Sequence, residues 1–272
     1  MSDNQKHPYH LVDPSPWPLV TAMSLLILAY GFVSFMHEDN VVVFAIGSVA
    51  LILSSFFWWR DIVSESEGGK FHNKVVQIGL RYGMILFIAS EVMFFSAWFW
   101  AFFDVAFYPG ADSVELIGRQ EALGGVFPPE EIELIPPFGI PLLNTFILLA
   151  SGGTITWAHH ALRENDRKNF LLFLTLTIIL GVIFTGFQGY EYMHATFSID
   201  EGIYASTFYM ATGFHGFHVM VGTAFLAVCL YRVYKNHFTP DRHFGLEAAA
   251  WYWHFVDVVW LFLYICVYIW GA

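Results

Sequence analysis

The sequence predicts an all-α integral membrane protein with seven transmembrane helices. Hydrophobic residues make up 57% of the chain and charged residues only 13%, against about 25% charged in typical soluble domains. The apolar residues gather into seven long segments, each about the length that a helix needs to cross a bilayer. The basic residues fall almost entirely between alternate segments, as they do in multi-span membrane proteins.

The expected spans are separated by polar connections. In chain order they are 17–36, 41–59, 77–108, 140–162, 170–195, 204–234 and 247–271. The longer ones exceed the thickness of a bilayer, so we expect them to tilt or to project beyond it. Tryptophans near the segment ends fit an interfacial aromatic belt.

Each span has its own signal. The first follows a polar, proline-rich N-terminus without the pattern of a signal peptide, and the second ends before Arg60. The third contains Tyr82 to Phe103, where Glu91 is the only charged residue. The fourth follows the long acidic loop 109–139, and the next two carry spaced glycines that allow close helix packing. The seventh is apolar except for a few ionisable groups on one side.

The positive charges predict the orientation, because seven spans put the two termini on opposite sides of the membrane. Eleven of the twelve basic residues fall on the side of the N-terminus, namely Lys6, Arg60, Lys70, Lys74, Arg81, Arg163, Arg167, Lys168, Arg232, Lys235 and Arg242. The other side receives only Arg119. We therefore expect a cytoplasmic N-terminus, or its organellar equivalent, and a periplasmic C-terminus.

Glu91 is the most informative polar residue within a span. A carboxylate at that depth costs at least ~2.5 kcal/mol unless it is protonated, paired or turned toward a polar interior. It is therefore either a functional acid or a neutral acid hydrogen-bonded to a neighbouring helix. The residues alone leave both interpretations open.

Two further pairs of residues could carry chemistry. Glu191 and His194 form an ExxH pair of the kind found in di-iron proteins, but such proteins need a second ExxH, which this chain lacks. His215 and His218 nearly share a helical face. They could ligate a metal or a haem, or they could hydrogen-bond within the helix bundle.

The last span carries Glu247, His254 and Asp257 toward one side of its helix, and that side must face the protein interior. They form either part of a proton path or a structural polar network. The chain has no Gly-rich phosphate loop, nucleophile elbow or HExxH motif. Its acids concentrate in loops, so we expect no nucleic-acid partner. Together these patterns favour an accessory subunit of a larger membrane assembly over a free-standing enzyme.

Seven segments match a known family. They are WWRDIVSES, RYGMILFIASEVMFFSAWFWAFF, LLNTFILLASG, TWAHHAL, FTGFQGYEY, YMATGFHGFHV and FGLEAAAWYWHFVDVVWLFLYICVYIWG. The sequence resembles subunit III of the aa3-type cytochrome c oxidases through nearly its whole length. The first two spans and the loop 109–139 match less specifically.

The resemblance implies a fold with a cytoplasmic segment 1–16, a two-helix unit 17–59, a cytoplasmic connection 60–76 and a five-helix bundle 77–272. In this family a V-shaped cleft that holds phospholipids separates the two helical units. The resemblance also implies a non-catalytic subunit of a proton-pumping complex that oxidises cytochrome c and reduces oxygen to water. Its implied tasks are to stabilise the catalytic core and to support proton uptake.

The resemblance also implies cofactors and partners. We expect no cofactor in this chain, and haem a, haem a3, CuA and CuB in the partner subunits I and II. Phospholipids are the expected ligands, and other respiratory complexes are further candidate partners. The expected location is the bacterial inner membrane, or the mitochondrial inner membrane if the chain is organellar.

Lipid-binding positions carry over where the motifs match. Trp59, Glu65 and His72 correspond to family positions near lipid headgroups. His218 and Arg232 correspond to another headgroup-binding pair. A guanidinium at a span end can hold a phosphate, and the alternative for Arg232 is ordinary snorkelling to the interface.

The last site expectations concern proton chemistry. Glu91 corresponds to a carboxylate that reacts with a hydrophobic carbodiimide, which implies a protonated, buried acid with a structural or modulatory role. His7 and His10 lie near the expected proton-entry side and are candidates for a proton antenna. The alternative is that they belong to an N-terminal tail that takes no part in proton uptake. The rival to the whole interpretation is a free-standing proton-coupled transporter, or a membrane di-iron enzyme, built around Glu91 or the ExxH pair.

Overall fold

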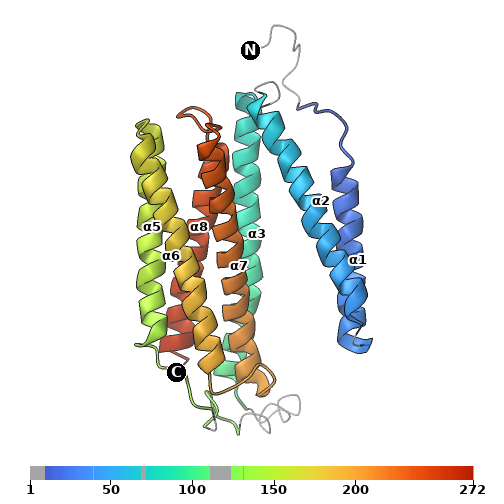
Figure 1. Ribbon diagram of the computed structural model, residues 1–272. Helices are drawn as coiled ribbons and strands as arrows, with labels where there is room; N and C mark the ends of the chain where they lie inside the picture. Colours follow the sequence, from blue (N-terminus) through green and yellow to red (C-terminus); the bar gives the residue numbers. More distant parts are fainter. Residues whose placement is uncertain (1–9, 39, 69–71, 111–123, 131, 272) are drawn as a thin grey trace. The chain divides into compact units, whose positions relative to one another are not determined.

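A computed structural model describes the chain except for residues 1–9, 39, 69–71, 111–123, 131 and 272. The described residues form seven long α-helices, and the last of them continues as a π-helical segment (Figure 1). The elements are α1 (Trp17–Glu38), α2 (Val41–Glu67), α3 (Lys74–Phe107), α5 (Ile140–Arg163), α6 (Arg167–His194), α7 (Gly202–Tyr234), α8 (Phe244–Leu263) and η2 (Tyr264–Ile269). The predicted class, an all-α membrane protein with seven spans, is confirmed.

Helix α2 extends beyond the apolar segment that predicted it. The apolar segment ends at Trp59, but the polar residues RDIVSESE that follow contain neither Pro nor Gly, and the helix continues to Glu67. It ends at Gly68, whose N–H donates to the carbonyl of Ser64 at 3.0 Å. Helix α3 then begins after Asn73, whose side chain accepts from the N–H of Val76 at 2.9 Å. The polar connection between the second and third spans is therefore largely helical.

The chain divides into two compact units, Met1–Tyr82 and Gly83–Ala272. In the first unit, α1 and α2 form a hairpin whose backbones touch. A Cβ atom on Gly31 would lie 2.5 Å from the backbone nitrogen of Phe44, and one on Gly47 would lie 2.5 Å from that of Leu28. Because neither backbone can move aside, both crossing positions require glycine.

In the second unit, helix α8 is the most buried element. In each span we consider an apolar window of 18 residues and the share of them that is buried within the protein. This share is 61% for the last span, Phe244–Ile269, against 39% for α5 and 28% for α6. Trp253 of α8 is fully buried and fits between Gly181 of α6 and Gly222 of α7. A Cβ atom on Gly181 would lie 2.6 Å from Cη2 of that indole, and one on Gly222 would lie 2.9 Å from Cε3.

The polar atoms of α8 tryptophans find partners on α5. Nε1 of Trp253 donates to Oγ of Ser151 at 2.9 Å, and Nε1 of Trp260 donates to Oγ1 of Thr145 at 3.0 Å. Each hydroxyl in turn donates to a backbone carbonyl of its own helix. A buried N–H without a partner is costly, so these two bonds fix the register of α8 against α5.

The turn between α5 and α6 closes one end of the second unit. The side chain of Asp166 accepts from the backbone N–H of Asn169 at 3.1 Å and so caps α6. This bond, followed by one from the Asn169 side-chain amide, lowers the pKa of Asp166 below its ordinary value. Arg167 donates to the side chain of Asn236 and to the carbonyl of Val233, which ties the start of α6 to the end of α7.

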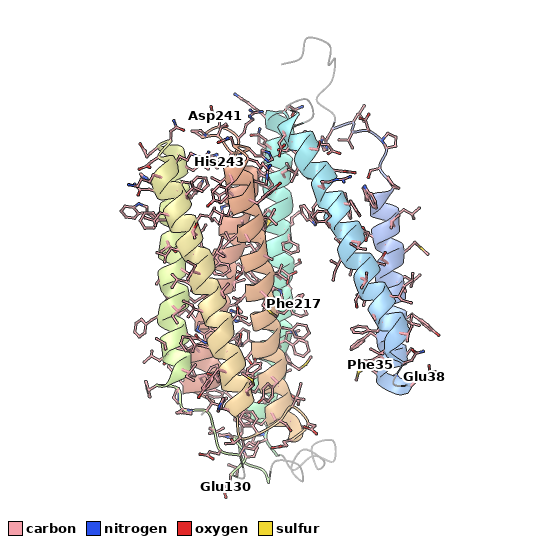
Figure 2. The ribbon with its side chains drawn as sticks, viewed as in Figure 1. Phe35, Glu38, Glu130, Phe217, Asp241 and His243 are labelled. Atoms are coloured by element: carbon pink, nitrogen blue, oxygen red, sulfur yellow. The ribbon has the colours of Figure 1, made fainter. Side chains whose placement is uncertain are left out.

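The exterior of the second unit is apolar along the helices and polar at their ends. Phe217 of α7 projects outward and is 54% exposed (Figure 2). Asp241 and His243 lie at one end of this unit, and Glu130 lies at the opposite end (Figure 2). This distribution is the one that a protein spanning a bilayer requires.

We predict that Gly181→Ala destabilises the protein by about 1–3 kcal/mol, because the added methyl group overlaps the buried ring of Trp253. The measurement is the midpoint of thermal unfolding in detergent. Gly186→Ala on the same helix is the matched control, since a Cβ atom there meets nothing within 4 Å. Equal midpoints for the two variants would contradict the tight fit of Trp253.

Candidate functional site

The structure joins Glu91 of α3 to His218 of α7. Nε2 of His218 lies 2.8 Å from Oε2 of Glu91, and Nδ1 of His218 lies 2.6 Å from the backbone carbonyl of Phe214. The His218 side chain is 9% exposed and that of Glu91 is 20% exposed. The two residues are 127 positions apart in the chain, so the sequence alone does not predict that they pair.

The two contacts of His218 restrict where the proton can lie. A carbonyl oxygen only accepts, so Nδ1 must carry a hydrogen. The contact between Nε2 and Oε2 then holds one proton, which sits either on the acid of Glu91 or on the imidazole. Both arrangements have no net charge. In either arrangement the carboxyl group of Glu91 has a partner within the protein, as an acid at this depth requires.

Aromatic rings surround His218. The ring centroids of Phe95, Phe94 and Tyr252 lie 5.0, 6.0 and 6.3 Å from that of the imidazole. Phe94 and Phe95 lie about one helical turn after Glu91 on α3, while Tyr252 comes from α8. The Glu91–His218 pair therefore sits where three helices meet, with apolar rings on several sides.

His215 serves a different contact although it lies only three residues from His218. It is fully buried, and its Nε2 lies 3.1 Å from the backbone carbonyl of Val256 of α8. Its ring lies 5.1 Å from that of Trp260. The two histidines therefore point at separate partners, and their geometry gives no support to a shared metal or haem.

The ExxH pair is divided as well. Glu191 is 5% exposed, and its Oε1 accepts from the hydroxyl of Tyr268 in η2 at 2.7 Å. His194 is exposed, stacks on Tyr190 with ring centroids 4.0 Å apart, and lies 2.9 Å through Nδ1 from the Tyr190 carbonyl. Glu191 thus links α6 to η2, and the pair does not face a common ligand.

Two ionisable groups of α8, His254 and Asp257, contact α5 separately. Nε2 of His254 lies 3.2 Å from Oγ1 of Thr156. Asp257 is 8% exposed and packs against Gly152, where a Cβ atom would lie 2.6 Å from its Oδ2. These contacts hold two helices together and favour the structural network over the proton path.

The residues expected near the first lipid headgroup lie in the first unit. Trp59 is 63% exposed on α2, and Glu65 and His72 are half-buried at the end of α2 and just before α3. The ring of His10 lies 5.3 Å from that of His72, so His10 joins this group. His7, the other expected antenna residue, lies outside the described residues.

Arg232 packs against the protein at the end of α7. Its guanidinium lies 4.5 Å from the centroid of the Phe238 ring, and a Cβ atom on Gly245 would lie 2.6 Å from its Nη1. Arg232 and His218 share one continuous helix and are about 21 Å apart along its axis. One phosphate group cannot contact both, so the geometry does not support them as a pair, and only Arg232 lies at a helix end.

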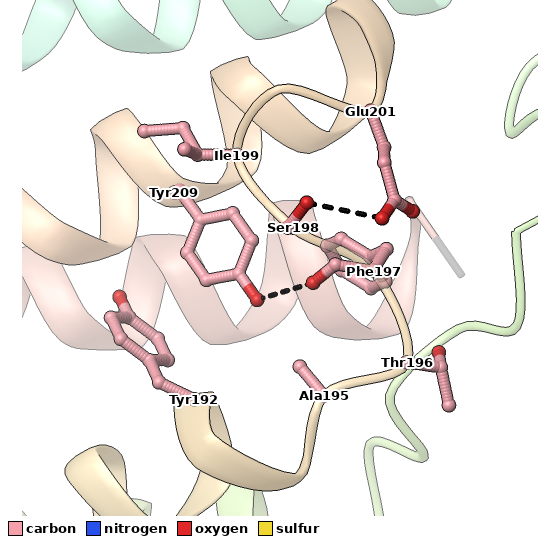
Figure 3. A pocket seen from close by; sticks show the side chains of 8 residues that line it. All are labelled: Tyr192, Ala195, Thr196, Phe197, Ser198, Ile199, Glu201 and Tyr209. Carbon is pink, nitrogen blue, oxygen red and sulfur yellow. Dashed lines mark hydrogen bonds between the residues drawn. The ribbon is translucent and has the colours of Figure 1, made fainter.

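The loop between α6 and α7 lines a pocket of about 560 Å³ that the sequence does not predict (Figure 3). The hydroxyl of Tyr209 donates to the carbonyl of Phe197 at 2.8 Å, and that of Ser198 donates to Glu201 at 3.0 Å. These polar groups are engaged with one another, so the pocket presents few of them to a ligand. We interpret it as a feature of the loop fold.

Seven apolar helices with polar side chains joined across them at depth define a multi-span membrane protein rather than a soluble enzyme. The model of the family described as "Cytochrome c oxidase subunit III" matches residues 7–272. The chain belongs to this family, so a complex with other oxidase subunits follows. Membership of this family fits a chain that holds no redox cofactor of its own.

Curated relatives from distant organisms agree. The chain is 51% identical over 270 residues to cytochrome c oxidase subunit 3 of Prototheca wickerhamii, covering 98% of this chain and 99% of the relative. It is 53% identical over 269 residues to the protein of that name from Gadus morhua, covering 99% of each. The corresponding protein of Sus scrofa is 52% identical over 269 residues, again covering 99% of each.

We predict that His218→Phe is destabilising by about 1–3 kcal/mol, because it leaves the acid of Glu91 without its partner. The double variant Glu91→Leu/His218→Phe should recover part of that loss, since both polar groups are then gone. The measurement is the temperature at which the subunit unfolds or leaves the purified complex. His194→Phe, at an exposed histidine, is the control. A double variant that is less stable than His218→Phe would contradict the pairing.

Proposed function

We propose that this chain is a non-catalytic, phospholipid-binding subunit of a proton-pumping cytochrome c oxidase. The observation that carries the proposal is the identity of 51–53% with proteins named cytochrome c oxidase subunit 3, over 98–99% of this chain. The complex oxidises cytochrome c and reduces oxygen to water. Haem a, haem a3, CuA and CuB belong to subunits I and II, and this chain stabilises that catalytic core.

The surfaces of α1, α2 and α3 support a role that depends on lipids and partner subunits. Only 17% of the apolar window of α1 and 11% of those of α2 and α3 are buried within the chain. Contacts inside the chain therefore leave most of this apolar surface uncovered. In a membrane complex, acyl chains and an apolar face of another subunit are the two materials that can cover it.

The proposed location is an energy-transducing inner membrane. Seven spans support a multi-pass protein, and the basic residues at alternate connections support an N-terminus on the cytoplasmic or matrix side. The lipid cleft between a two-helix unit and a five-helix bundle is part of this proposal, as is contact with other respiratory complexes.

We propose two headgroup positions. In the first, Trp59 offers an exposed indole on α2, and Glu65 lies in the last turn of the same helix, close to His72. A carboxylate and an imidazole can hold the ammonium and phosphate groups of a zwitterionic headgroup. In the second, Arg232 offers a guanidinium at the end of α7, where phosphate groups lie.

The comparisons give no support to the rival transporter or di-iron enzyme. We expect the chain to co-purify in mild detergent with haem-containing subunits, while the isolated chain shows no visible absorbance. Element analysis and optical spectra of the two preparations make the measurement. Stoichiometric iron in the isolated chain, or proton-coupled transport by that chain alone in liposomes, would overturn the proposal.

We predict that Arg232→Ala lowers the phospholipid retained by the purified oxidase and reduces the number of turnovers before inactivation. The initial rate should change little, because under this proposal the redox chemistry takes place in other subunits. Phospholipid is measured as phosphorus per haem. Arg242→Ala removes the same charge from an exposed position at the same end of the unit and serves as the control. Immediate loss of activity with lipid intact would contradict the assignment.

We also propose that His7 and His10 take part in proton uptake, since imidazoles exchange protons near neutral pH. His7→Ala/His10→Ala should slow proton uptake, measured with a pH-sensitive dye during a single turnover of the complex. His37→Ala, at an exposed histidine near the end of α1, controls for the loss of an imidazole. Uptake at the wild-type rate in the double variant would rule the antenna out.

A further inference from the structure

Three side chains from separate parts of the first unit meet at one point. His10 comes from the segment before α1, Glu65 from the last turn of α2, and His72 from the connection before α3. One ligand atom from each lies within 4.8 Å of the others. His10 and Glu65 are far apart in the chain, so local geometry does not force them together. Their meeting is a property of the tertiary fold.

We propose that His10, Glu65 and His72 form a binding site for a divalent transition metal, with Zn²⁺ as the ion that fits best. Two imidazole nitrogens and one carboxylate oxygen form a common zinc ligand set, and they leave a fourth position open. Magnesium and calcium take oxygen ligands almost exclusively, so two imidazoles disfavour both. Copper(II) also binds imidazole strongly and belongs to the same chemical class.

The spacing of the ligand atoms suits such an ion. Zinc bonds of about 2.1 Å in a tetrahedral site place neighbouring ligand atoms about 3.4 Å apart. The three atoms here lie within 4.8 Å of one another, so they need to approach by little more than an ångström. Small side-chain rotations can supply this movement, because His10 is exposed and the other two residues are half-buried.

The charges around the cluster also favour a cation. The last two turns of α2 carry Asp61, Glu65 and Glu67, against the single base Arg60. That base is engaged elsewhere, since its guanidinium lies 3.4 Å from Asp61 and over the ring of Phe57. Glu65 also sits at the C-terminal end of α2, where the helix dipole is negative.

Metal and lipid headgroup make different demands on these residues. A metal needs the lone pairs of both imidazoles and therefore needs His10. A headgroup at the position proposed above needs donors and the exposed indole of Trp59, and it does not need His10. Variants can therefore distinguish the two ligands. Loss of His10 should remove the metal, and loss of Trp59 should remove the lipid.

The test uses the intact oxidase complex, stripped with a chelator, incubated with micromolar ZnCl₂ and freed of unbound ions by gel filtration. We expect His10→Ala, Glu65→Gln and His72→Ala each to carry one zinc equivalent fewer than the wild type. His194→Ala, at an exposed histidine of α6, and Trp59→Ala should carry the wild-type number. Trp59→Ala should instead lose phospholipid. Incubation with MgCl₂ should not restore or replace the bound ion.

X-ray absorption at the zinc edge gives an independent readout. The difference between wild type and His10→Ala should correspond to an ion with two imidazoles and further oxygen ligands. If Glu65→Gln or His72→Ala does not assemble, His10→Ala decides alone, because His10 lies in an exposed segment outside the helices. A wild-type zinc count in His10→Ala, or an equal loss in His194→Ala, would overturn the proposal.

Discussion

The structure of the second unit depends on the rule that polar atoms inside a membrane must find their partners within the protein. Helix α8 shows the rule at work, since the indole N–H groups of Trp253 and Trp260 reach Ser151 and Thr145 of α5. These bonds set the position of α8 along α5. The ring of Trp253 then requires glycine on α6 and α7, so one buried side chain relates four helices to one another.

The same rule changes the meaning of the intramembrane acids. Glu91 pairs with His218, and Glu191 accepts from Tyr268, so each acid joins two elements that are distant in sequence. Each contact lowers the cost of burying a carboxyl group without requiring catalysis or transport. Membrane depth was therefore a good indicator that Glu91 has a partner, and a poor indicator of chemistry. This fits the family described as "Cytochrome c oxidase subunit III", to which the chain belongs.

The sequence predicted the spans well because bilayer thickness imposes a length of apolar residues that is visible in the chain. It predicted the end of α2 poorly, since hydropathy reports where the bilayer ends, whereas the helix continues until Gly68. Helical spacing showed that His215 and His218 nearly share a face. It could not show that Val256 and Glu91 oppose them, because those partners come from other helices. The convergence of His10 with Glu65 was hidden for the same reason.

The two units differ in what holds them together. In the second unit, 61% of the residues in the apolar window of the last span are buried within the protein. In the hairpin of the first unit, the corresponding shares are only 17% for α1 and 11% for α2. A hairpin with so little internal apolar contact draws its stability from its surroundings, so contacts at its ends carry more weight than equal contacts in the bundle. The cluster of His10, Glu65 and His72 lies at such an end and brings together three segments of the chain. An ion bound there would connect those segments directly.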